Sequence, residues 1–183
     1  MSEKYKANTD HPYFITLTIQ GWIDLFTRHQ YTEIVTESLK HCYKKKNLVI
    51  HEYVVMSNHI HLILQNDDAR LPDILRDMKR HIANAITDLL AADEKESRRE
   101  WILKLFKYYA KYLKQNEQYV VWRKTNKPIV LDNQDIYNRC KVYIHQNPVK
   151  AMLVTEPHHW LYSSANADNP LAVILGKRFG DKE

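Results

Sequence analysis

Two stretches rich in β-branched and apolar residues, separated by only two residues, place the tightest limit on how this chain can fold. Residues 48–56 and 59–65 both have the composition of strands, and Ser57-Asn58 between them is a turn-forming pair. The simplest arrangement is a β-hairpin whose second strand begins with His59-Ile60-His61. Because side chains alternate between the two faces of a strand, the two imidazoles share one face, and Ile60 and the following leucines lie on the opposite, buried face.

The rest of the chain predicts one further strand and several helices. An alternating β-rich run covers 13–20 and is followed by Gly21, which suits the end of a strand. Apolar residues recur at helical spacing over about 28–46, 72–89 and 101–113. Asn133 or Asp135 could cap a fourth helix that runs to about Asn147, where Pro148 disfavours continuation, and short strands are expected at 119–122 and 129–131. We expect an α+β domain with a mainly antiparallel sheet, the histidines on a central strand and helices packed chiefly against one face.

Length and composition limit the domain organisation and the partner. With 183 residues, 44% of them hydrophobic, the chain has material for a single domain over 1–183. A net charge of +5 and a pI near 9.0 suit a polyanionic partner without proving one. Cys42 and Cys140 are too few for a disulfide framework, and the apolar run 13–19 is too short for a membrane span. We therefore expect a cytoplasmic protein without membrane attachment.

A second motif lies late in the chain, in the stretch from Tyr143 to Lys150. Tyr143 and Asn147 are four residues apart, so a phenol and a carboxamide lie on the same face of a helix. Each residue alone has a more common explanation, because tyrosines on helices usually pack and an asparagine before proline usually ends a helix. A His-x-His taken alone is likewise more often a pair of half-exposed sheet residues than a metal site.

Together and in this order, the two motifs resemble those of the HUH (His-hydrophobic-His) single-tyrosine transposases, especially the REP-associated tyrosine transposase branch. The similarity covers a core of about residues 13–165, and the stretches that carry it are 13–18, 54–64, 79–83, Trp122, 143–150 and 162–164. The chain departs from the family pattern at two points. Ser57 stands where the family usually has proline, and Ala151-Met152 replaces a small residue followed by glycine.

The resemblance implies a ferredoxin-like fold and a specific chemistry. It implies that His59, His61 and Asn147 hold a divalent metal, Mg²⁺ or Mn²⁺, and that Tyr143 is the nucleophile. The implied reaction is cleavage and rejoining of single-stranded or hairpin DNA through a 5′-phosphotyrosine, as in DNA transposition. Some relatives are monomers and others are homodimers, and the sequence does not decide between them.

This chemistry has a physical reason for its residue types. A phosphodiester is protected by its own negative charge, so attack needs a Lewis acid that withdraws charge from the phosphate. Two imidazoles and one amide oxygen leave coordination positions open, which favours Mg²⁺ or Mn²⁺ over closed structural zinc. Because imidazole binds metal only when neutral, we expect cleavage to fade below a pH of about 6.5.

Basic and aromatic side chains could supply the DNA-binding surface. The candidates for phosphate contacts are Lys150, Arg123, Lys79 and Arg80, with Lys107, Lys111 and Lys124. Trp122, Tyr108 and Tyr112 are candidates for base stacking. Solvated helix faces and ordinary core aromatics explain any one of them about equally well.

Other functions are weighed against this one. A histidine-triad hydrolase would need histidine at Ile63, and a zinc deaminase would need His-x-Glu and Cys-x-x-Cys motifs that the sequence lacks. The main alternative is a domesticated, non-cleaving binder of hairpin nucleic acid that keeps the fold. A metal-binding regulatory protein is a third possibility, and it would show no preference for single strands over duplex.

Overall fold

The computed structural model describes residues 11–113, 118–124 and 128–177, so both ends of the expected 1–183 domain lie outside the described residues. The strands are β1 Tyr13–Thr18, β2 Val49–Val55, β3 His59–Gln65 and β4 Ile129–Val130. The helices are α1 His29–Lys46, α2 Leu71–Ala92, α3 Arg99–Tyr112 and α4 Gln134–Lys150. Short 3-10 turns cover Gln20–Trp22, Leu25–Thr27, Pro157–His159 and Ala172–Ile174.

The four strands form one antiparallel sheet in the order β2-β3-β1-β4. The predicted hairpin is confirmed, because β2 and β3 pair and the Met56 N–H donates to the His59 carbonyl at 2.8 Å across the turn. β3 lies between β1 and β2, with Thr16 opposite His61 and Thr18 opposite His59 on β1. The predicted α+β class and the central position of the histidine strand are therefore confirmed.

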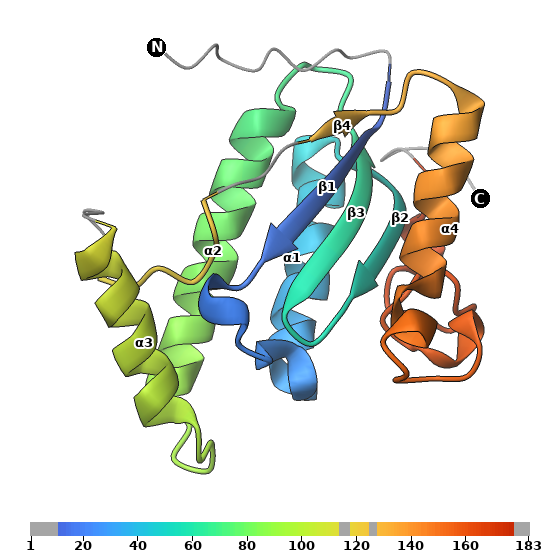
Figure 1. Cartoon of the computed structure of the whole chain (residues 1–183). Coiled ribbons are helices and arrows are strands. Elements are labelled where there is room, and N and C mark those ends of the chain that lie inside the picture. The colour runs from blue at the N-terminus through green and yellow to red at the C-terminus, as the bar shows by residue number, and fades with distance from the viewer. Residues whose placement is uncertain (1–10, 114–117, 125–127, 178–183) are drawn as a thin grey trace.

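The two faces of the sheet are covered differently (Figure 1). On one face, Ile15 and Leu17 of β1 and Ile60 and Leu62 of β3 are buried in the main core, with Ile82 of α2. Complete burial of each such side chain stabilises the fold by about 1.5–3 kcal/mol. α1 and α2 supply this layer and α3 packs on α2, whereas α4 contacts β2 and β3. A smaller core of five buried residues accompanies α4: Val54, Met56, Ile63, Leu131 and Ile144.

The start of α4 follows the prediction, but its end does not. The Asn133 side chain accepts a hydrogen bond from the Ile136 N–H at 2.9 Å, as expected of an N-cap. The helix then continues through Pro148 to Lys150, so the predicted end at Asn147 is wrong. A proline in a helix forfeits the bond to the carbonyl four residues earlier. The helix tolerates this loss because Pro148 lies in its last turn. The carbonyls of Pro148 and Val149 accept hydrogen bonds from the N–H groups of Leu153 and Met152, which follow the helix.

Residues 119–122 do not form the predicted strand, since Trp122 pairs with Ile19 only as an isolated bridge. The other short strand is confirmed at β4, which pairs with β1. Among the described residues, no helix combines the length and apolar character that a bilayer crossing requires.

Candidate functional site

His59 and His61 project from β3 toward the face of the sheet on which α4 lies. Their ring centroids are 4.7 Å apart. His61 is only 4% exposed, and its Nδ1 lies 2.8 Å from Thr16 Oγ1 on the neighbouring strand. Phe14 stacks against the same imidazole at 5.4 Å. The His61 Nε2 is buried and has no hydrogen-bond partner in the described part of the chain.

Burial keeps both imidazoles neutral. It lowers the pKa of His61 to about 3, helped by the nearby His59. Burial also lowers the pKa of His59, although a hydrogen bond with the Asn147 side chain opposes that shift. These shifts move the expected loss of metal binding to a lower pH than the ordinary histidine pKa implies.

α4 presents Tyr143 and Asn147 to the histidines. The Tyr143 ring lies edge-on to the His61 ring at a centroid distance of 5.0 Å, and Asn147 bonds to His59. Tyr143 is nevertheless 42% exposed, so its ring is open to a ligand. The Lys150 ammonium lies 5.6 Å from the centre of that ring. The structure thus brings together five residues that the sequence selected, from two segments far apart in the sequence. They are His59, His61, Tyr143, Asn147 and Lys150.

The donor set suits a divalent cation on chemical grounds. The unpartnered Nε2 of His61 is a buried polar atom that costs about 1–3 kcal/mol when unsatisfied. An oxygen donor, Asn147, lies beside the second imidazole. Within the described ranges, no three His, Cys, Asp or Glu side chains are grouped so that they could hold a metal ion. A cation here would therefore need amide, phosphate or water oxygens in addition to the imidazoles.

The other predicted DNA contacts are scattered. The Arg123 guanidinium lies over the Trp22 ring at 5.2 Å, whereas Lys79 and Arg80 belong to α2, which covers the other face of the sheet. Trp122 is only 8% exposed, and its indole N–H donates to the Lys79 carbonyl at 3.0 Å, so the suggestion that it stacks on bases is wrong.

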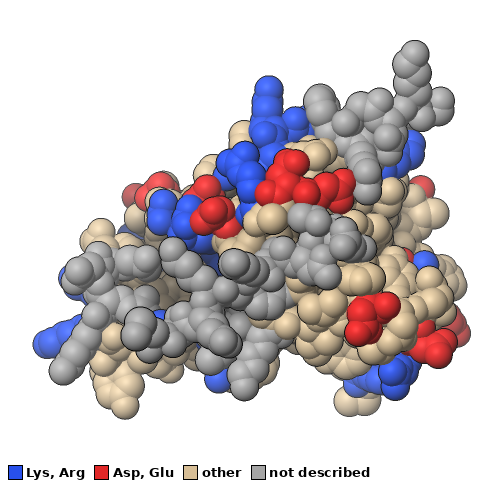
Figure 2. All heavy atoms as spheres, turned by 90° about the horizontal axis from the view of Figure 1, so that it is seen from above, with Lys and Arg blue, Asp and Glu red and all other residues tan. Residues whose placement is uncertain are grey.

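The remaining aromatic and basic candidates are exposed and distant in the chain from the histidines. Tyr108 and Tyr112 on α3 stack on each other at 5.9 Å. Lys107 and Lys111 are exposed on the same helix, and Lys124 is exposed after Arg123. On the face seen in Figure 2, Lys and Arg side chains lie next to acidic ones.

Sequence reasoning missed Trp22, which is 56% exposed beside the histidines. Its ring meets the His59 ring edge-on at 6.4 Å. The available signal was Gly21, which marks a turn and thus a change of chain direction just before the tryptophan.

A second missed feature fixes α4 to the sheet. The buried Glu52 of β2 accepts hydrogen bonds from Lys141 and His145 of α4, each at 2.8 Å, and from Ser164 at 2.6 Å. Burial raises the pKa of Glu52, but these hydrogen bonds outweigh it and lower the pKa to about 2. We call these four residues the β2–α4 clamp. Sequence periodicity could not reveal it, because its members come from three distant segments.

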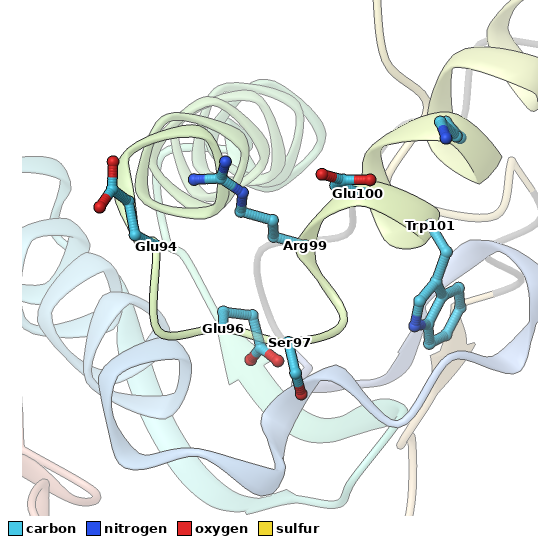
Figure 3. Close-up of a pocket in the computed structure, with 7 residues that line it drawn as sticks. Glu94, Glu96, Ser97, Arg99, Glu100 and Trp101 are labelled. Atoms are coloured by element: carbon cyan, nitrogen blue, oxygen red, sulfur yellow. The ribbon is translucent and has the colours of Figure 1, made fainter.

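A surface pocket of about 380 Å³ lies elsewhere, at the α2–α3 connection (Figure 3). Its lining is mainly charged, and the residues are Glu94, Glu96, Ser97, Arg99, Glu100, Trp101 and Lys104. Glu96 is already paired with Arg28 and Arg98. None of the predicted site residues lines this pocket.

Comparisons with known proteins identify a structural neighbour. No family model and no curated protein matches the sequence. The fold is similar to a solved structure described as "Structure of the REP associates tyrosine transposase bound to a REP hairpin". The TM-score is 0.54 and the identity 17%, and the match covers 100% of this chain and 96% of that one. At this identity, the likeness shows that the two chains share a fold, the α+β fold with its antiparallel sheet.

Proposed function

We propose that the protein cleaves and rejoins single-stranded DNA by transesterification, with Tyr143 as the nucleophile. The observation that carries this proposal is the position of Tyr143, whose ring is partly exposed and lies 5.0 Å from the buried ring of His61. Likeness to a hairpin-bound tyrosine transposase supports the choice of hairpin DNA as substrate.

The reaction balances without a nucleotide cofactor. The Tyr143 oxygen forms a bond to phosphorus, the bond from phosphorus to the 3′ oxygen breaks, and the phenol gives up its proton as the 3′-hydroxyl gains one. A DNA 3′-hydroxyl later attacks the 5′-phosphotyrosine, which restores the phosphodiester and releases the phenol. The energy of the original ester is kept in the covalent intermediate.

The side chains of this chain have separate tasks in that sequence. His59, His61 and Asn147 would hold Mg²⁺ or Mn²⁺, which supplies Lewis-acid activation of the phosphate when bound. Thr16 orients the His61 ring through its Nδ1, leaving the other ring nitrogen available as a ligand. Lys150 places a positive charge beside the Tyr143 ring, where it would attract the phosphate to the phenol.

A covalent-adduct assay tests the proposal. The protein is incubated with single-stranded hairpin oligonucleotides from the flanks of its own gene, with Mn²⁺, Mg²⁺ or chelator, and resolved under denaturing conditions. We expect a metal-dependent adduct that Tyr143→Phe abolishes. Tyr137→Phe is the matched control, since Tyr137 lies on α4 but packs against His51 instead. Tight hairpin binding with no adduct from any flank would support the non-cleaving alternative.

A further inference from the structure

Trp22 has a conformation that packing does not explain. Its backbone φ is +57°, in the left-handed region that bulky residues rarely adopt, and Gly21 before it has a φ of +73°. Burial of the indole does not offset this strain, because the ring is exposed. Strained residues of this kind concentrate at functional sites, where the surrounding structure holds them in place.

Neighbouring chain segments fix the backbone of the turn that carries Trp22. The Gln20 N–H donates to the Val121 carbonyl at 2.7 Å, and the Arg123 N–H donates to the Thr18 carbonyl at 2.8 Å. Gly21 suits this turn because its φ is +73° and because an added Cβ would lie in tight contact, 3.2 Å from the Tyr109 ring on α3. The turn is therefore fixed on both sides.

The exposed ring joins a charged group to the candidate site. Arg123 lies over the indole at 5.2 Å, and the indole meets His59, which neighbours His61 and through it Tyr143. A flat aromatic surface beside a guanidinium suits one class of ligand in particular. Unpaired nucleobases stack on such rings while the cation binds the backbone phosphate.

We propose that Trp22 is a stacking platform for an unpaired nucleobase next to the bond that Tyr143 attacks, and that Arg123 binds a phosphate of the same strand. This inference rests on the proposed function for its substrate. Stacking tolerates any base, so the platform would position the strand and leave sequence recognition to other contacts.

Binding measured without cleavage tests the platform. The full-length protein in EDTA is titrated with a fluorescently labelled 12-nucleotide oligothymidylate and with an abasic chain of the same length. The abasic chain keeps the phosphates and removes every base. We measure discrimination as the dissociation constant for the abasic chain divided by that for oligothymidylate. We expect Trp22→Ala to lower this ratio about tenfold from its wild-type value. Arg123→Gln should instead weaken the binding of both probes. It should also reduce the salt dependence of the binding constant by the equivalent of about one phosphate contact.

Two further variants separate stacking from folding. Trp22→Gly also removes the ring but relieves the left-handed strain, so we expect an unchanged or higher thermal midpoint together with the same loss of discrimination. Trp101→Ala removes another exposed indole, from α3, and should keep the wild-type ratio. An unchanged ratio in Trp22→Gly, or an equal loss in Trp101→Ala, would overturn the platform.

Failure of the platform and failure of the proposed function give different results. If Trp22→Gly gives the wild-type adduct yield and an unchanged probe ratio, the platform proposal is contradicted and the role of Tyr143 as nucleophile stands. Loss of discrimination in Trp22→Gly, in a protein that forms no adduct, keeps the platform and removes the cleavage reaction.

Discussion

The imidazole of His61 has one hydrogen-bonding atom that no described residue satisfies. One ring nitrogen lies beside Thr16, and the other is buried without a partner among the described residues. A buried nitrogen of this kind destabilises the fold unless a ligand satisfies it. The free energy of unfolding should therefore depend on divalent metal.

Metal should stabilise the wild-type protein through this ring. At a hundredfold excess of Mn²⁺ over its dissociation constant, we expect about 2.7 kcal/mol of added stability, measured by chemical unfolding with and without EDTA. His61→Ala should abolish the increment. His51→Ala is the control, because His51 lies on β2 and bonds to Gln65. Equal stabilisation of the His61 variant would show that the metal binds elsewhere.

The pH profile of cleavage should extend into acid. Burial lowers the pKa of both imidazoles, that of His61 to about 3, so protonation competes with metal binding at a lower pH than it does for an ordinary histidine. We expect the fall in adduct yield on acidification to have its midpoint below the ordinary histidine pKa of about 6.5. Initial rates in matched-ionic-strength buffers measure this profile. A midpoint at 6.5 would mean that the rings titrate as exposed histidines do.

At the scale of the element, α4 ends in a motif whose left-handed position is usually occupied by glycine. The Leu153 N–H bonds to the Pro148 carbonyl and the Met152 N–H to the Val149 carbonyl, each at 2.9 Å, which is the Schellman pattern. Met152 occupies the left-handed position with a φ of +56° and is almost fully exposed. This is the position at which the resembling family has glycine.

Met152→Gly should stabilise the protein. It relieves a left-handed side chain without removing packing, and we expect a gain of about 0.5–1 kcal/mol in the free energy of unfolding. Met152→Ala keeps a Cβ and should give less than half of that gain. Denaturant titration measures both. A loss of stability in the glycine variant would show that the methionine side chain makes contacts that matter.

The β2–α4 clamp should make stability sensitive to acid. The folded pKa of Glu52 is lowered from 4.5 to about 2, so its contribution is complete above pH 4.5 and is lost as pH falls toward 2. At neutral pH this amounts to about 3 kcal/mol.

Glu52→Gln should remove that contribution. We expect a loss of about 3 kcal/mol at pH 7 and a smaller difference from wild type at pH 3, measured by urea unfolding. Glu37→Gln breaks an exposed pair with Lys40 and should change stability by less than about 0.5 kcal/mol. Similar losses in the two variants would mean that the clamp does not fix α4.

The elements show where sequence reasoning succeeds. Local signals predicted the hairpin, a helix cap at Asn133 or Asp135, and the shared face of Tyr143 and Asn147, because each depends on residues a few positions apart. The end of α4 escaped prediction, since it depends on carbonyl bonding from beyond Pro148. Burial of Trp122 and exposure of Trp22 also escaped, because both depend on how distant segments pack.

At the scale of the whole molecule, the larger core and the candidate site lie on opposite faces of the sheet. The main core with α1 and α2 covers one face, and the histidines meet α4 on the other. The site therefore depends on α4 docking against its own sheet. Because α4 packs on its own sheet and places the Tyr143 ring 5.0 Å from the His61 ring, we predict that one subunit completes the site.

Subunit mixing tests that prediction. Tyr143→Phe and the double variant His59→Ala/His61→Ala are each expected to form no adduct. If each subunit uses its own tyrosine, an equal mixture of the two should also form none, because neither chain holds both halves. If tyrosine helices were exchanged between randomly paired subunits, the mixture would recover about a quarter of the wild-type yield, because about half of the dimers would be mixed and each would hold one complete site. Adduct yield per subunit should likewise stay constant over a hundredfold dilution of the wild-type protein, because a site built within one chain does not require association.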